Sequence, residues 1–180
     1  SCVAAGHRYT VHDVITKAVA AFAREAHRHV VEQPRPFTFI DTGARPDLCI
    51  TIGREQVLVD VTLTNVNLGD PDKQEAVKRR RYEGLITLEN AVMHSRYSLT
   101  PFVLDTRGGM STSAVTLLKR LAKDIGRHTG KPASIALRMM QQRISVILNR
   151  HVSRIAQRAR ITSIEKPLLI PLAPSQIQAT

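Results

Sequence analysis

Apolar residues recur along the chain with two periods, one typical of helices and the other of strands. Spacings of three and four predict helices at residues 10–31, 71–94, about 112–129 and 133–160. Short β-branched runs predict strands at residues 37–41, 47–52, 57–64 and 99–105. This order predicts an α/β fold with a small mixed central sheet flanked by helices and with extra helices at the C-terminal end.

Two prolines sharpen the predicted elements. Asp70 before Pro71 is typical of a helix start, because aspartate caps free N–H groups and proline fits the first helical position. Pro101 cannot donate a hydrogen bond to a neighbouring strand, so its strand is expected near an edge of the sheet.

The chain is long enough for one domain with a C-terminal addition. Gly130 and Pro132 separate the last long helix from the segment before it. We expect the core of the domain over residues 1–130. Residues 131–180 are expected to form a basic helix and a proline-punctuated tail packed on the same domain.

The net positive charge of the protein comes entirely from its C-terminal part. Basic residues number 26 and acidic residues 15, a formal net charge of +11. Residues 1–105 hold 13 of each, whereas residues 106–180 hold 13 basic side chains and only two acids. Such a one-sided distribution is typical of a protein that binds a polyanion, and we expect a nucleic acid. A basic protein with no such partner is the alternative.

Arginines accompany the last predicted helix. Arg150, Arg154 and Arg158 step by four residues, so they would lie on one side of the helix and contact successive phosphates. Together with Arg138 and Arg143 they are the predicted contacts to the nucleic acid.

Composition and missing motifs exclude several classes of protein. No stretch approaches the roughly 18 apolar residues of a membrane span, and no membrane partner is expected. Aromatic residues make up 4% of the chain and Trp is absent, which disfavours modules that stack on single-stranded bases. No Walker loop, GxGxxG or GxSxG motif occurs, which removes most nucleotide-dependent enzymes and hydrolases as alternatives.

Two aspartates lie on neighbouring predicted strands. Asp47 opens one strand, and Asp60 lies inside the next, 13 positions later. A hairpin through Gly53 would bring both carboxylates to the same end of the sheet. An acid within a run of Val and Leu is costly to bury unless it is paired or binds a metal. Spacing alone leaves open a divalent-metal site and a purely structural role for the pair.

Short motifs around these aspartates occur in an ordered set. They are Arg45-Pro46-Asp47-Leu48, Leu58-Val59-Asp60-Val61-Thr62-Leu63 and Lys78-Arg79-Arg80-Arg81-Tyr82, with His12-Asp13, Thr106-Arg107-Gly108 and Arg143-Ile144-Ser145 in the expected order around them. The set resembles the PD-(D/E)XK nuclease core. It is most similar to the restriction-like endonuclease domain that ends the reverse transcriptase polyprotein of site-specific non-LTR retrotransposons. The resemblance covers roughly residues 1–160.

The resemblance implies a metal centre and its ligands. Asp47, Asp60 and the backbone carbonyl of Val61 would hold Mg²⁺ or Mn²⁺. Such ions prefer oxygen ligands and keep several waters, so few protein ligands suffice. Asp13 on the first helix is a possible accessory acid.

The lysine of the motif departs from its standard place. Thr62 stands two residues after the second acid, where the lysine is usual, and the related subgroup carries its lysine on the following helix with a tyrosine one turn later. Lys78 and Tyr82 have that spacing and share one side of the predicted helix. Lys78 is therefore expected to approach the carboxylates, with Tyr82 as an accessory residue and Lys73 as a competitor for the lysine role.

The function that the resemblance implies is metal-dependent nicking of target DNA, which exposes a 3′ end for target-primed reverse transcription. The implied partners are double-stranded DNA and the reverse transcriptase domain of the same polyprotein, in the nucleus. The alternative is a catalytically inactive, basic nucleic-acid-binding module of a larger polyprotein.

Overall fold

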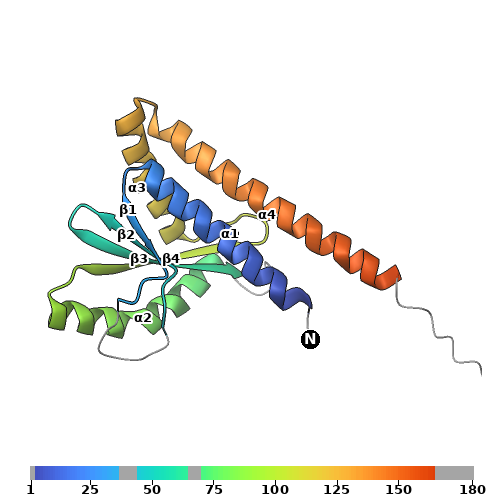
Figure 1. Ribbon diagram of the computed structural model, residues 1–180, viewed down its shortest axis with the longest axis horizontal. Helices are drawn as coiled ribbons and strands as arrows, with labels where there is room; N and C mark the ends of the chain where they lie inside the picture. The colour runs from blue at the N-terminus through green and yellow to red at the C-terminus, as the bar shows by residue number, and fades with distance from the viewer. Residues whose placement is uncertain (1–2, 37–43, 65–69, 165–180) are drawn as a thin grey trace, which may run out of the picture.

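The computed structural model describes residues 3–36, 44–64 and 70–164. Within these ranges the chain forms four helices and four strands, and the strands make up a single sheet (Figure 1). The helices are α1 (Val3–Glu25), α2 (Pro71–Met93), α3 (Thr112–Thr129) and α4 (Ala133–Ile164), and the strands are β1 (His29–Glu32), β2 (Leu48–Ile52), β3 (Glu55–Thr64) and β4 (Tyr97–Asp105). The predicted α/β fold, a small mixed sheet flanked by helices, is confirmed.

The sheet has the order β1-β2-β3-β4 and contains both strand directions. β2 pairs antiparallel with β1 and with β3, whereas β3 and β4 are parallel. The tight turn from β2 to β3 uses Gly53 at φ 66°, a conformation that glycine adopts at little cost. Parallel strands need a long connection, which α2 supplies between β3 and β4. The edge position that Pro101 predicts for its strand is also confirmed, since β4 ends the sheet.

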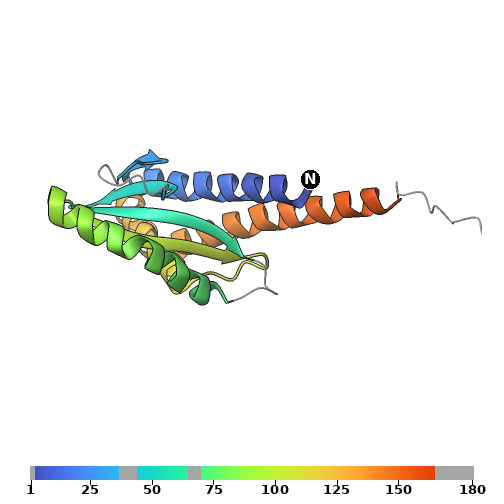
Figure 2. The same ribbon diagram turned by 90° about the horizontal axis from the view of Figure 1, so that it is seen from below.

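Helices cover both faces of the sheet (Figure 2). On one face, α2 packs Tyr82 and Ile86 against Leu58 and Cys49. On the other face, α1 and α3 build the larger hydrophobic core, and α4 packs on both of them. Since successive side chains of a strand point to opposite faces, β3 contributes to both clusters.

The first helix is shorter at its C-terminal end than its apolar spacing predicts. Residues 10–31 are predicted as one helix, but α1 ends at Glu25 and residues 29–32 form β1. His27 adopts the left-handed conformation, φ 54°, that commonly closes helices. Beyond it, backbone hydrogen bonds to β2 hold the chain extended. Pairing with a distant strand thus overrides the local helical pattern.

The predicted start of the first helix is also wrong, because α1 begins at Val3, seven residues before residue 10. The remaining boundaries agree with the sequence to within a few residues. β3 and β4 each begin two residues early, at Glu55 and Tyr97, and α4 continues to Ile164 rather than ending near residue 160. The strand predicted at residues 37–41 and the proline-punctuated end of the chain lie outside the described residues.

Side chains and one glycine define the helix ends. The Asp70 carboxylate accepts a hydrogen bond from the Asp72 N–H at 3.0 Å at the start of α2, and the Ser111 hydroxyl accepts one from the Ala114 N–H at 3.4 Å at the start of α3. Gly130 ends α3 at φ 70°. Across the described parts of the chain, no helix has the length and apolar character needed to cross a membrane.

Candidate metal centre and nucleic-acid interface

Asp47 and Asp60 lie at facing positions on neighbouring strands. In the antiparallel register Leu48 is opposite Val59, so the residue just before β2, Asp47, lies beside Asp60. The Asp47 N–H also donates to the Val59 carbonyl at 2.9 Å, which fastens Asp47 to β3. The hairpin therefore brings both predicted carboxylates to the same level of the sheet.

Asp60 is buried beneath α2 and is held by two side chains of that helix. Its side chain is 8% exposed, and Lys78 Nζ lies 2.7 Å from Oδ2. The Tyr82 hydroxyl donates to Oδ1 at 3.2 Å. Lys78 and Tyr82 are one helical turn apart, so both reach the same carboxylate. Burial and the Asp60 charge raise the pKa of Tyr82, which keeps the phenol protonated as a donor.

Asp47 is more accessible and is held by the backbone and by α1. Its Oδ2 accepts the Val61 N–H at 2.7 Å and lies 3.2 Å from His12 Nε2. The hydrogen bond to Asp47, aided by the carboxylate charge and opposed by burial, raises the pKa of His12 from 6.5 to about 9. His12 is therefore a cation at neutral pH, with both ring nitrogens available as donors.

The charges around the two aspartates balance. Lys78 neutralises Asp60, and protonated His12 neutralises Asp47. Each cation comes from a different helix, α2 or α1, so the two helices meet the sheet at the same place from opposite faces. Without these cations the two neighbouring carboxylates would repel each other.

Oxygen atoms around the pair fit a hard divalent cation. The N–H and C=O of a strand residue point to the same side of the strand, and the Val61 N–H points at Asp47, so the Val61 carbonyl faces that side as well. Thr62 Oγ1, on the Asp60 side of β3, is buried and has no hydrogen-bond partner within the described residues. Carboxylate, carbonyl and hydroxyl oxygens are donors that Mg²⁺ and Mn²⁺ accept.

Among the described residues, no group of three or more His, Cys, Asp and Glu side chains is arranged to hold a metal ion. Of the three predicted accessory residues, Asp13, Tyr82 and Lys73, only Tyr82 is bonded to an aspartate of the pair within the described residues. The Asp13 side chain is 65% exposed and contacts His12 Nδ1 at 3.3 Å. Lys73 is exposed in the first turn of α2. The lysine that reaches Asp60 is Lys78.

The direct contact of His12 with Asp47 is the part of the site that sequence reasoning missed. In the sequence His12 stands out only as half of the His12-Asp13 motif. A signal was present, because His12 precedes Ile15 and Val19 by three and seven positions and so lies on the stripe of α1 that faces the sheet. A polar residue on the apolar side of a helix indicates that its side chain has a hydrogen-bond partner in the interior.

Acidic side chains near the start of α2 fix that helix in place. The Asp72 carboxylate accepts the Thr112 N–H at 2.8 Å, and Glu75 accepts the Ser113 N–H at 3.1 Å and its hydroxyl at 2.6 Å. These carboxylates bind N–H groups in the first turn of α3, which lack partners inside their own helix. The connection holds α2 over the sheet and thereby positions Lys78.

The predicted DNA-binding arginines of α4 differ in their surroundings. Arg143 pairs with Glu25 of α1 at 2.6 Å. At Arg158 the structure describes only the backbone. The exposed arginines with no acidic partner among the described residues are Arg138, Arg150 and Arg154. Figure 1 shows the C-terminal part of α4, which carries Arg150 and Arg154, extending past α1 and away from the sheet.

Comparison of the chain with models of protein families found no match, and comparison with curated proteins found no similar sequence. The functional inference therefore depends on the residues of this chain: the geometry of the two aspartates and the ordered motifs around them.

Proposed function

We propose that this protein is a metal-dependent DNA endonuclease of the restriction-like class, using Mg²⁺ or Mn²⁺ to nick double-stranded DNA. One observation carries the proposal. Asp47 and Asp60 lie side by side on adjacent strands, and Lys78 Nζ lies 2.7 Å from the Asp60 carboxylate. Neighbouring carboxylates can hold a divalent cation, and an adjacent ammonium can stabilise charge on the attacked phosphate, as metal-assisted phosphodiester hydrolysis uses them.

Each residue has a distinct part in this chemistry. Asp47, Asp60 and the Val61 carbonyl would hold the cation, which when bound supplies an activated water and a Lewis acid for the scissile phosphate. Lys78 would stabilise negative charge that develops on the attacked phosphate and orient the attacking water. Tyr82 holds the Asp60 carboxylate in one orientation through its hydrogen bond.

The biological setting is proposed from the ordered motifs. Nicking of chromosomal DNA, so that a 3′ end primes reverse transcription, would place the protein in the nucleus with a reverse transcriptase domain as its partner. The competing proposal is an inactive binding module. Thr62 favours that module because it replaces the usual lysine, and the test must decide between them.

The test compares nicking of supercoiled plasmid by the parent and by Asp60→Asn in Mg²⁺ or Mn²⁺. We expect the variant to lose at least about 100-fold in rate while its DNA affinity is unchanged or slightly higher, since a negative charge near a polyanion is removed. Glu83→Gln is the matched control, because Glu83 is an exposed acid of α2, away from the pair.

Asp60 is buried, so the variant could also lose stability, and melting temperatures are measured alongside. Asp47→Asn provides a second variant at a more accessible carboxylate. If folded Asp60→Asn and Asp47→Asn nick as fast as Glu83→Gln, or if the parent binds DNA but never nicks it, the nuclease proposal fails and the binding module stands.

A further inference from the structure

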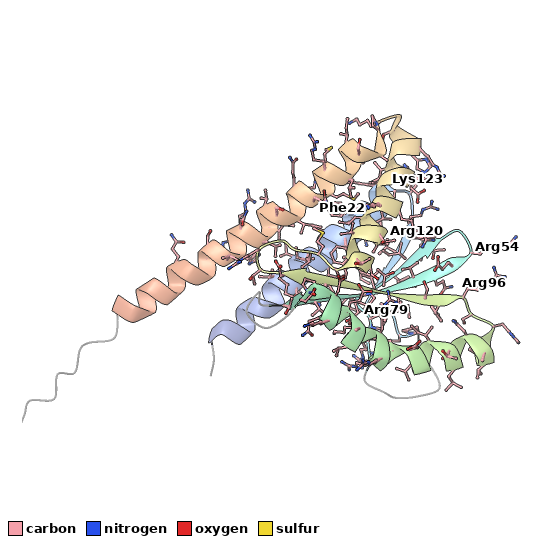
Figure 3. The ribbon with its side chains drawn as sticks, turned by 180° about the vertical axis from the view of Figure 1, so that it is seen from behind. Phe22, Arg54, Arg79, Arg96, Arg120 and Lys123 are labelled. Atoms are coloured by element: carbon pink, nitrogen blue, oxygen red, sulfur yellow. The ribbon has the colours of Figure 1, made fainter. Side chains whose placement is uncertain are left out.

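A second group of exposed basic side chains lies at the end of the sheet opposite to the free end of α4. Figure 3 shows Arg54 and Arg96 near each other at this end, with Arg120 and Lys123 on neighbouring α3. We define the distal basic patch as Arg54, Arg96, Lys119 and Lys123, all of which are exposed.

The fold brings these residues together from three elements. Glu55, next to Arg54, accepts hydrogen bonds from the Ser98 hydroxyl at 2.6 Å and from Arg120 at 2.7 Å. These bonds join the β2–β3 hairpin to β4 and to α3. The Gln56 N–H donates to the Arg96 carbonyl at 2.9 Å, which sets Arg96 beside the same hairpin.

Within the described residues, the patch keeps its charge because nearby acids are already paired. Glu55 is neutralised by Arg120 at 2.7 Å. On α3, Asp124 is paired with Arg28 at 2.6 Å and with Arg127 at 3.2 Å. None of the four patch residues forms an ion pair with a described acid, so four positive charges face solvent together.

The distance to the aspartate pair suits one DNA duplex. Arg54 precedes Asp60 by six positions, and a strand rises about 3.3 Å per residue, so the two are about 20 Å apart. Six base-pair steps of B-DNA cover about the same length at 3.4 Å each. A duplex whose scissile phosphate lies near the aspartate pair can therefore place another phosphate near the patch.

We propose that the distal basic patch is a second phosphate-binding surface for duplex DNA, separate from the arginines of α4. This inference takes its ligand from the proposed function but requires no cleavage. The patch would contact the DNA backbone without reading base sequence, since exposed Arg and Lys side chains on several elements bind phosphates through their charge.

The test measures binding of the full chain to a 30-base-pair duplex by fluorescence anisotropy, in EDTA, across a range of salt concentrations. In Arg54→Gln/Lys123→Gln we expect the slope of log affinity against log salt to fall by about 1.8, which is 0.9 for each phosphate contact. The matched control is Lys17→Gln/Arg80→Gln, which removes the same charges from exposed positions on α1 and α2.

Equal slopes for the patch and control variants would overturn the inference. It would also be overturned if only single-stranded DNA or RNA of the same length lost affinity in the patch variant. Because EDTA prevents metal-dependent cleavage, a failed nicking experiment leaves this result intact. Conversely, a nuclease that nicks normally with an inert patch refutes only the inference.

Discussion

The aspartate pair and the C-terminal part of α4 use charge in opposite ways. At the pair, each carboxylate is matched by a cation at 2.7 or 3.2 Å, and one of the two is nearly buried. On α4, Arg150 and Arg154 are exposed and no described acid pairs with them. Paired and partly buried charges hold atoms in fixed positions, whereas unpaired exposed charges create a field that acts on a distant polyanion. Within one chain, the charges at the aspartate pair thus serve to position side chains, and those on α4 would serve to attract a polyanion.

The largest effect is expected from a substitution at the aspartate pair, where paired charges hold atoms in position. Lys78→Ala should lower the nicking rate by about 100-fold or more, because the positive group nearest Asp60 is removed. Thr62→Ala should lose much less, since its hydroxyl carries no charge. Single-turnover plasmid nicking at saturating DNA measures both rates.

Lys73→Ala is the control for the lysine, because it removes the same charge from an exposed position on the same helix. A larger loss in Thr62→Ala or in Lys73→Ala than in Lys78→Ala would assign the catalytic role to another residue.

A smaller effect is expected from substitutions on α4, where exposed charges would attract the DNA. Substituting Gln for Arg150, Arg154 and Arg158 together should reduce the salt slope of DNA binding by about 2.7, at 0.9 per phosphate contact, with no change in melting temperature. Nicking at saturating DNA and low salt should survive. Salt titrations on two unrelated duplex sequences should give similar losses, since phosphate contacts carry no sequence information.

Arg143→Gln offers the internal comparison on the same helix. Because Arg143 already pairs with Glu25, its loss should change the slope less than the loss of Arg150 alone. A triple variant that melts at lower temperature with an unchanged slope would show that these arginines stabilise the fold instead.

The smallest expected effect concerns pH and the cation at Asp47. The pKa of His12 is raised from 6.5 to about 9, so the stability gained from its protonated form is fully present below pH 6.5 and is lost as pH rises through 9. In metal-free buffer, His12→Gln should melt about 3 °C below the parent at pH 6. The difference should vanish above about pH 9.5.

His29→Gln serves as the reference, because His29 is exposed on β1 and pairs with no described acid. A His12→Gln difference that stays constant across this pH range would mean that packing, and not the ion pair with Asp47, explains the loss.

Much of the fold followed from local pattern. The β-branched run of β3, the Asp70–Pro71 helix start and the proline that marks β4 as an edge strand are each encoded within a few residues. The spacing of Lys78 and Tyr82 likewise predicts that they share one side of α2, because helix geometry is set by the backbone alone.

Only the tertiary structure decided what depends on distant segments. Residues 29–32 have a helical pattern yet form β1, because β2 supplies hydrogen bonds that no local spacing can reveal. His12 meets Asp47 across 35 positions, and Arg143 meets Glu25 across 118. Periodicity indicates which side of a helix or strand is buried. Which residue packs against that side depends on how the elements pack together, and local sequence does not reveal it. For that reason the two aspartates could be named from sequence, while the histidine beside them required the fold.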